Sequence, residues 1–391
     1  MMAATGRRYV RGIPPGFDEG SPASWGDRIR SARDRWVANP RFQRLAAAFP
    51  LTRPLARRRA RALFDLCAGF VYSQVLVACV RLGLFDLLAE RSQTAAALAN
   101  RLSLSTDAMT TLLDAAESLG LLSRRPGGRF ALGPLGAPMV GNAAIAALVE
   151  HHALLYADIA DPVALLRGDG GRSQLAAFWA YAGATDPASA TAERVDSYTT
   201  LMAASQSLVA DVILDAYSLR RHRCLLDVGG GDGSFLVAAA ARATDLALQL
   251  FELPPVAARA HARFAAAGLA PRSTTFGGNC LVERLPRGAD VASLVRVVHD
   301  HDDAAALTLL KAVRECLPRQ GTLLLAEPMA DAAGARPVGA AYFGFYLKAM
   351  RSGRPRTAAD LAGLLGKAGF GQVRQVSTRL PLATCLLVAT V

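Results

Sequence analysis

The sequence predicts an α/β protein with a helical N-terminal half and a C-terminal open sheet that is covered by helices on both faces. From residue 223 onward, short apolar runs alternate with alanine- and leucine-rich helical stretches, which is the pattern of a parallel sheet. The first run, Leu225–Val228, ends in Gly-Gly-Gly-Asp-Gly at 229–233, a turn between a strand and a helix N-terminus. At 391 residues, the chain is long enough for two domains.

Residues 1–61 are predicted to form a basic N-terminal arm that is partly disordered. They contain fourteen arginines and four acidic residues, a net charge of +10 out of +12 for the whole chain. Trp36, Phe42 and Leu45 recur near helical spacing among these arginines. Such a segment can lie on an anionic membrane surface, bind nucleic acid or strap one protomer to another.

Residues 62–142 are expected to form a winged-helix domain, which is all-helical apart from a small hairpin that follows the short helices. Its second helix, 108–119, precedes a two-strand pattern at 121–132. That helix carries Asp114 and Glu117 and no arginine, which suits phosphate poorly. We therefore expect a protein–protein contact here and no nucleic acid.

Residues 143–220 are expected to be helical and to adjoin a ligand cavity, and residues 221–391 to form the sheet domain. Aromatic and apolar side chains of the helical region could line the cavity or belong to the core, namely Tyr156, Phe178, Trp179, Tyr181, Tyr198 and Met202. Seven strands are predicted, at 223–228, 246–252, 273–277, 290–298 and 321–327, with an antiparallel edge hairpin of 372–376 and 383–391.

Several classes of protein are not expected from the sequence. The best membrane-span candidate, Phe70–Phe85, is interrupted by Gln74, Arg81 and Gly83. The N-terminus has arginines but no apolar core of a secretory signal. The six cysteines and six histidines show no ligand spacing, so no structural metal is expected.

The glycine turn and an acidic residue downstream of it predict a nucleoside-bearing cofactor. Glycines at 229, 231 and 233 let the backbone approach a ligand closely, but Ser234 breaks the G-x-G-x-x-G spacing of dinucleotide sites. The second strand ends in Glu252, where a carboxylate can hold two ribose hydroxyls. This spacing favours S-adenosylmethionine over a nicotinamide.

Two further residues at strand ends indicate an active site. The fourth strand is followed by His299 and the fifth ends in Glu327, so both are expected in the crevice at the carboxyl ends of the strands. A histidine oriented by a carboxylate is a suitable general base for a methyl acceptor. His301 could be a second base, although we interpret it as part of the cofactor wall.

These motifs together resemble the O-methyltransferases that dimerise through a winged-helix domain, which act on caffeate in plants and on polyketides in bacteria. The resemblance spans about residues 63–391, and it implies a homodimer through 62–142 and a Rossmann-like, seven-stranded methyltransferase domain. It rests on the segments LDVGGGxG at 226–233, FELP at 251–254, VHDxxD at 298–303, AEPM at 326–329, RT at 356–357 and AGF at 368–370.

A closer resemblance, to the carotenoid O-methyltransferases of purple photosynthetic bacteria, involves the arm. It rests on NPRF at 39–42, FPLTRP at 49–54, RRRARALFDL at 57–66, GFVYSQ at 69–74, LVRV at 294–297 and SGRPR at 352–356. It implies methylation of the tertiary 1-hydroxyl of an acyclic hydroxycarotenoid, in the carotenoid biosynthesis of photosynthesis. It also places the protein in the cytoplasm, either free or peripheral on an anionic inner or intracytoplasmic membrane.

The resemblance implies His299 as the base and Glu327 as the acid beside it. The implied cofactor residues are Asp227, Gly229, Gly230, Gly231, Gly233, Glu252, Asn279, Cys280 and Arg296. Three positions depart from the family: Asn279 replaces an aspartate that binds adenine, His301 a tryptophan, and Pro355 a second glutamate beside the base.

Two alternative functions stay open. The chain could methylate another apolar pigment or an aromatic polyketide, including at carbon in a bacteriochlorophyll precursor. It could also be a winged-helix regulator that senses S-adenosylmethionine, although the acidic second helix and the retained His299 and Glu327 count against this.

Overall fold

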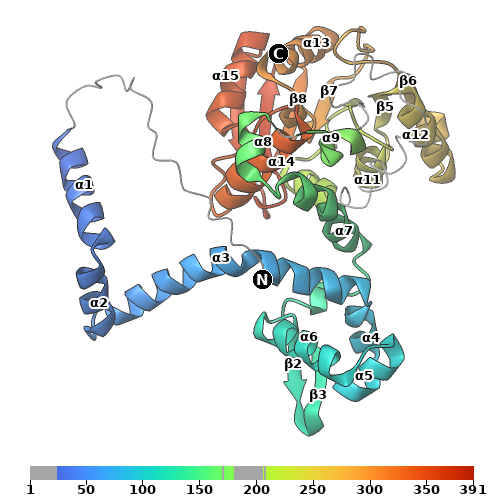
Figure 1. Ribbon diagram of the computed structural model, residues 1–391. Helices are drawn as coiled ribbons and strands as arrows, with labels where there is room; N and C mark the ends of the chain where they lie inside the picture. The colour runs from blue at the N-terminus through green and yellow to red at the C-terminus, as the bar shows by residue number, and fades with distance from the viewer. Residues whose placement is uncertain (1–23, 170, 180–205, 207) are drawn as a thin grey trace. The chain divides into compact units, whose positions relative to one another are not determined.

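The computed structural model describes residues 24–169, 171–179, 206 and 208–391 (Figure 1). These residues divide into two compact units, with the boundary between Val75 and Leu76. The boundary lies inside one long helix, so each unit is described by itself.

The first unit consists of helices. They are α1 (Trp25–Ala38), α2 (Pro40–Ala48) and the first part of α3 (Arg53–Arg81). Ser24 forms a capping box with Asp27 at the start of α1, and the side chain of Asn39 caps α2. Neither α1 nor α2 contains a buried residue, so their apolar side chains contribute no core.

Helix α3 contradicts the expectation that no apolar stretch is long enough to cross a membrane. It has 29 residues, and an 18-residue window in it has a mean hydropathy of 1.8 with 11% of the window buried. The expectation considered Phe70–Phe85, whereas residues 62–79 carry only one charged side chain, Asp65. By length and composition α3 could cross a membrane, but core helices of soluble proteins can have the same length and composition.

Residues 82–142 form a helical module with a small sheet. The helices are α4 (Leu84–Glu90), α5 (Ala95–Leu102) and α6 (Thr106–Ser118), and the strands are β1 (Gln93–Thr94), β2 (Leu122–Arg125) and β3 (Arg129–Leu132). The predicted hairpin is present as β2 and β3, which pair antiparallel. Strand β1, which the sequence analysis missed, extends it to three strands in the order β1-β3-β2.

Helices α7 (Ala143–Asp158), α8 (Pro162–Arg167) and α9 (Gln174–Phe178) follow this module. Leu155, Leu165 and Leu175 from these helices pack with Tyr346 and Leu347 of α14 (Phe343–Met350) in one apolar cluster. The predicted helical region is therefore tied to the far C-terminal part of the chain. Tyr181, Tyr198 and Met202 lie outside the described residues.

The C-terminal sheet has seven strands in the order β6-β5-β4-β7-β8-β10-β9, as predicted in number. Strands β4 to β8 run parallel, and β10 pairs antiparallel with both β8 and β9. The strands are β4 (Cys224–Val228), β5 (Ala247–Glu252), β6 (Ser273–Gly277), β7 (Val291–Val295), β8 (Thr322–Glu327), β9 (Gln372–Val376) and β10 (Cys385–Thr390). The last two confirm the predicted edge hairpin.

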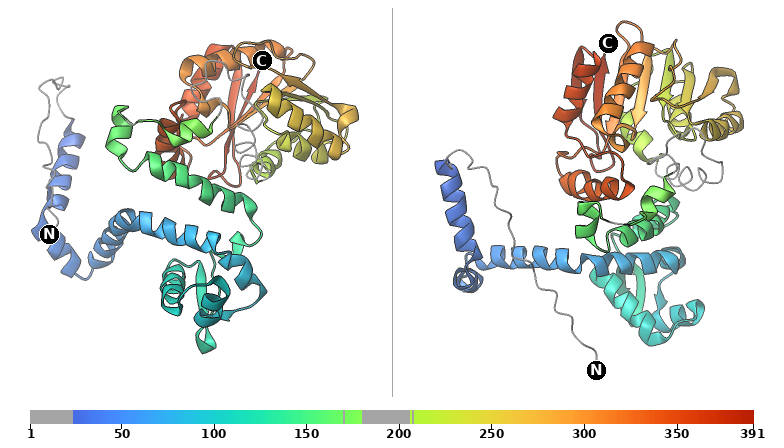
Figure 2. Two further views of the ribbon diagram at one scale, coloured as in Figure 1. Left: turned by 45° about the vertical axis from the view of Figure 1, so that its right-hand side comes forward. Right: turned by 45° about the horizontal axis from the view of Figure 1, so that its top comes forward.

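Helices cover both faces of this sheet (Figure 2). Alternate strand residues pack against α13 (Asp303–Cys316) and α15 (Ala358–Ala368) on one face. The opposite face packs against α11 (Ser234–Arg242) and α12 (Pro254–Ala266). This doubly wound arrangement brings the carboxyl ends of β4, β5, β7 and β8 to one edge.

Candidate active site

The glycine turn after β4 needs glycine for two different physical reasons. Gly229, Gly231 and Gly233 have φ values of +68°, +59° and +78°, which side chains rarely adopt. A β-carbon on Gly230 would lie 2.1 Å from Oδ2 of Asp227, so contact excludes a side chain there. At Gly231 a β-carbon would meet nothing within 4 Å, which leaves the backbone open to a ligand.

Asp227 is fully buried beneath this turn. The hydroxyl of Ser293 on β7 donates to its Oδ1 at 2.6 Å, whereas its Oδ2 has no hydrogen-bond partner within the described part of the chain. Burial raises the pKa of Asp227 to about 7, and the Ser293 hydrogen bond opposes this effect. An unpaired buried oxygen is costly unless it is protonated or a ligand completes its bonding.

Glu252 lies at the end of β5 beside the turn. Its carboxylate accepts hydrogen bonds from the backbone N–H of Gly231 at 3.0 Å and of Leu253 at 2.7 Å. Burial raises the pKa of Glu252 to about 7, while these two donors oppose the shift. The open turn and this carboxylate fit a nucleoside-bearing cofactor, with Glu252 placed to accept from ribose hydroxyls.

Asn279 and Cys280 follow β6 at the same edge of the sheet. The Oδ1 of Asn279 accepts from the backbone N–H of Leu281 at 3.0 Å, so its NH₂ group is the part that could donate to a ligand. Burial, reinforced by the charge of Glu252, raises the pKa of the Cys280 thiol to about 12. This thiol is a neutral, apolar wall near Glu252.

Strand β7 ends at Val295, three residues before the predicted end at 298, and Arg296 follows it. Its φ of +58° is the left-handed conformation, which costs a residue with a side chain about 1–2 kcal/mol. Its N–H still donates to the carbonyl of Ala326 at 2.8 Å. The chain turns out of the sheet here and enters a short 3₁₀ turn, Val298–Asp300, that carries His299. Such strain is common next to functional sites.

His299 is buried between two carboxylates. Its Nδ1 bonds Oε2 of Glu327, and its Nε2 lies 3.1 Å from Oδ1 of Asp300. Glu327 is held in turn by the backbone N–H groups of Val297 and Val298, at 3.1 and 2.7 Å. Burial lowers the pKa of His299, but the charges of Asp300 and Glu327 outweigh it, so the net pKa is raised. The sequence pattern did not indicate that Asp300 would lie against the His299 ring.

His301 lies one residue beyond this group. Burial is the largest effect on its pKa, which is lowered, and this favours a neutral ring. Asp302 caps α13 by accepting from the N–H of Ala305 at 2.9 Å. The carboxylate of Asp303, the next residue, is engaged by arginines.

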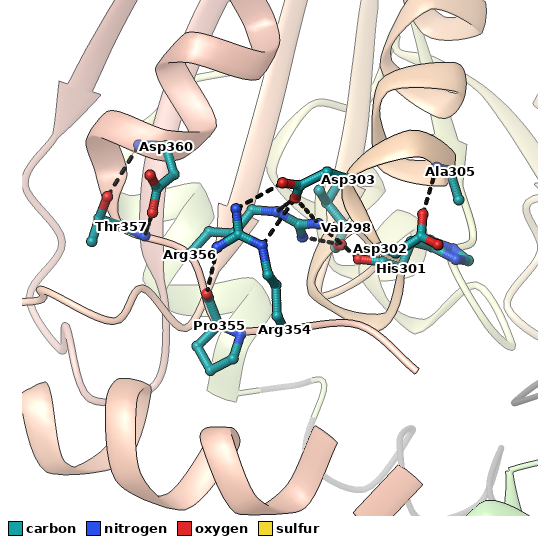
Figure 3. A network of polar contacts seen from close by, with 10 residues as sticks. All are labelled: Val298, His301, Asp302, Asp303, Ala305, Arg354, Pro355, Arg356, Thr357 and Asp360. Atoms are coloured by element: carbon teal, nitrogen blue, oxygen red, sulfur yellow. Dashed lines mark hydrogen bonds and ion pairs between the residues drawn. The ribbon is translucent and has the colours of Figure 1, made fainter. Parts of the chain in front are cut away.

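A network of arginines holds the turn that carries His299 (Figure 3). The guanidinium of Arg356, 2% exposed, donates to the carbonyls of Val298 and His301 at 2.8 and 2.7 Å. It also pairs with Asp303, as does Arg354. These two arginines lower the pKa of Asp303 to about 2. Nothing in the sequence pattern alone indicated these contacts.

The backbone next to this network closes on the same turn. The N–H of Arg354 donates to the carbonyl of His299 at 3.0 Å, and the hydroxyl of Ser352 donates to that of Asp300. A β-carbon on Gly353 would lie 2.0 Å from the His299 oxygen. Residues 352–356 therefore bind every carbonyl from 298 to 301, at the place where the family resemblance expects a glutamate.

An aromatic cluster lies beside the His299 ring. Phe343 makes an edge contact with it, with ring centroids 5.6 Å apart. Tyr342 and Tyr346 continue the cluster along α14 and the π-helical turn before it, Pro337–Tyr342. None of these three aromatic residues was among the predicted cavity residues.

The polar atoms of this cluster bond one another. The hydroxyl of Tyr346 bonds Nε2 of His151 at 2.8 Å and accepts from Nε1 of Trp179 at 3.0 Å, and the hydroxyl of Tyr342 bonds Nε2 of His152 at 2.9 Å. Burial, and then the charge of His152, lowers the pKa of His151 to about 4, so its ring is neutral. The surface that these residues present next to His299 is therefore chiefly apolar.

Comparisons with known proteins agree with this fold. The O-methyltransferase domain family matches residues 156–371, and the O-methyltransferase dimerisation domain family matches residues 64–142. The chain is 43% identical over 357 residues to demethylspheroidene O-methyltransferase of Cereibacter sphaeroides, covering 90% of this chain and 93% of that one. Identity to the enzyme of the same name from Rhodobacter capsulatus is 38%, covering 91% and 88% of the two chains.

Solved structures share the fold. Human N-acetylserotonin methyltransferase in complex with S-adenosylmethionine superposes with a TM-score of 0.68 at 22% identity, over 85% of this chain and 97% of that one. The mitomycin 7-O-methyltransferase gives a TM-score of 0.69 at 22% identity, over 86% and 100% of the two chains.

The matched O-methyltransferase domain shows an S-adenosylmethionine-dependent methyltransferase, and the open glycine turn, the carboxylate of Glu252 and the buried His299 are compatible with that class. The matched domains and the identity over nine-tenths of the chain specify it further. The chain belongs to the O-methyltransferase family, and within that family it is similar to the demethylspheroidene O-methyltransferases.

Proposed function

We propose that this enzyme methylates the tertiary 1-hydroxyl of an acyclic hydroxycarotenoid, with His299 as general base. The activity that the names of the two bacterial relatives state is the main support for the acceptor. The aromatic cluster adds a physical argument, because its hydroxyl and imidazole groups bond one another and the apolar ring of Phe343 lies next to His299. Such a wall suits a polyene and offers few partners to a polar acceptor.

His299 is the group best placed to take the hydroxyl proton. Glu327 accepts from Nδ1, so Nε2 is the nitrogen that takes the proton, and the carboxylate of Asp300 at 3.1 Å stabilises the positive charge formed there. When bound, S-adenosylmethionine supplies an activated methyl group. A tertiary alcohol is a far weaker acid than a phenol, so no imidazole can ionise it in advance. The proton must leave as the new C–O bond forms, and positioning carries much of the rate.

The test is transfer of labelled methyl to extracted hydroxycarotenoids beside a phenolic control, with the wild-type enzyme and His299→Ala. We expect the wild type to label the carotenoid and the variant to lose about 10²–10⁴-fold in turnover. The affinity of the variant for S-adenosylmethionine should stay within about threefold, because His299 is not in the ribose or glycine-turn contacts. Near-wild-type turnover would refute the base, and preference for the phenol would refute the acceptor.

We further propose that the chain acts as a homodimer through residues 62–142 and resides in the cytoplasm, peripheral on an anionic membrane. The match of the dimerisation domain to residues 64–142 supports the dimer. The apolar acceptor supports the membrane location, because carotenoids dissolve in bilayers. Light scattering coupled to gel filtration of the full chain tests the dimer, and a monomeric mass would refute it.

A further inference from the structure

The helices α1 and α2 carry an apolar face that is exposed to solvent. At about 100° per residue, Trp25, Ile29 and Trp36 lie within about 60° of one another on α1, and Phe42 and Leu45 share one side of α2. Trp36 and Phe42 meet edge to face, with ring centroids 5.9 Å apart. Trp25, Trp36 and Leu45 are 79%, 68% and 69% exposed. The first unit therefore leaves this face uncovered.

The charges are arranged around this face rather than across it. On the helical wheel of α1, Arg28 and Arg33 flank the apolar sector, whereas Asp27 and Asp34 lie on the opposite side. Residues 24–61 contain eleven arginines and two aspartates, a net charge of +9. Each aspartate already pairs with an arginine of its own helix. Fixed positive charge beside a row of exposed aromatic rings fits an anionic lipid surface.

A second copy of the chain fits this face less well. Two arms would bring net charges of +9 together, and the residues from 62 onward carry only about +2 in total, so they offer no acidic complement. The matched dimerisation domain also begins at residue 64, after this face. Nucleic acid could pair its phosphates with the arginines, but it would leave the apolar side chains of this face exposed to water.

We propose that the apolar face of Trp25, Ile29, Trp36, Phe42 and Leu45, with its flanking arginines, docks the enzyme on an anionic lipid bilayer. The inference rests on the proposed location of the enzyme at a membrane. Its test uses vesicles without acceptor, so the result does not depend on which hydroxyl is methylated.

The experiment is flotation of the full-length protein with phosphatidylglycerol vesicles and with phosphatidylcholine vesicles, at low and at high salt. We expect binding to the anionic vesicles that weakens as salt rises. The variant Arg28→Gln/Arg33→Gln, which removes two arginines that flank the apolar face, should bind roughly 30-fold more weakly, since each basic residue near an anionic surface contributes about fivefold. Trp36→Gln/Leu45→Gln should lose about tenfold or more through the apolar contact.

Two controls separate lipid binding from misfolding and from charge in general. Arg220→Gln/Arg221→Gln removes two exposed charges from the second unit and should bind vesicles like the wild type. Both arm variants should keep the melting temperature and the turnover of detergent-dispersed acceptor. Equal binding to both lipids, or no loss in either arm variant, would overturn the proposal. If the arm variants dissociate the dimer while their flotation is unchanged, the face belongs to a contact with a second copy. If the wild-type protein binds duplex DNA more tightly than anionic vesicles, the face belongs to nucleic acid.

Discussion

Replacement of Arg356 is expected to impair catalysis although this residue does not contact the His299 ring. Its guanidinium is buried and bonds the carbonyls of Val298 and His301, which lie before and after His299 in the turn. Without these two bonds the 3₁₀ turn loses its main side-chain restraint. The ring of His299 would then be held chiefly by Glu327.

The contacts allow the size of the effect to be worked out. Each carbonyl left without a donor costs about 1–3 kcal/mol, so the loss of both bonds in Arg356→Met should lower the free energy of unfolding by about 2–6 kcal/mol. The ion pair with Asp303 adds little, because that carboxylate is 53% exposed. A shift of the base by about 1 Å can cost about 10²-fold in rate. We therefore expect kcat to fall about 10²-fold, while KM for S-adenosylmethionine changes less than about threefold.

The assay is steady-state methyl transfer by Arg356→Met, Arg356→Lys and the control Arg354→Gln, each normalised to folded protein by thermal melting. Lysine keeps the positive charge but lacks the planar guanidinium that bonds both carbonyls at once, so Arg356→Lys should retain part of kcat. Arg354→Gln loses an exposed pair but keeps its backbone bond to His299, so kcat should stay within about threefold. If Arg356→Met lowers only the melting temperature, with normal kcat per folded enzyme, the residue is structural and the reasoning is refuted.

Three further predictions concern His299, the glycine turn and the aromatic cluster. Because His299 must be neutral to accept a proton and its pKa is raised above 6.5, kcat should fall as pH drops through that raised pKa. Asp300→Asn removes one charge that raises this pKa, so the acidic limb of the pH–rate profile should move to lower pH. An unmoved limb would contradict the pairing of His299 with Asp300. Gly230→Ala should abolish cofactor binding in equilibrium dialysis, because its β-carbon would strike Asp227, and retained binding would disprove this clash. Tyr346→Phe should lower the melting temperature, corresponding to about 1–3 kcal/mol for each polar partner it leaves unpaired, and an unchanged value would show that those partners find water.

Much of the catalytic sheet could be predicted from the sequence because its signals are local. The apolar runs and the glycines at 229–233 specify strands and a turn within a few residues of chain. Glu252, His299 and Glu327 could be placed at one edge because parallel strands end together. Their roles as cofactor or catalytic residues stay predictions that the geometry is compatible with.

Contacts between distant segments could not be predicted in this way. The two bonds from Arg356 to the turn at 298–301 join residues more than fifty positions apart, and no periodicity marks them. The pairing of His151 with Tyr346 spans 195 residues. The early end of β7 depends on the left-handed backbone of Arg296, which is not a conformation that an arginine in an apolar run suggests.

The family resemblance implies a glutamate at the position of Pro355, so the second carboxylate beside His299 must come from elsewhere in this chain. A glutamate at 355 would approach His299 from a distant segment and would position the ring directly. Here Asp300, the next residue in the chain, lies against Nε2 instead. A carboxylate on the same turn cannot fix that turn in space, so another group must. The bonds that Arg356 donates to the carbonyls of Val298 and His301 supply this restraint, so Arg356 and Asp300 together can do what the resemblance implies for a glutamate at 355.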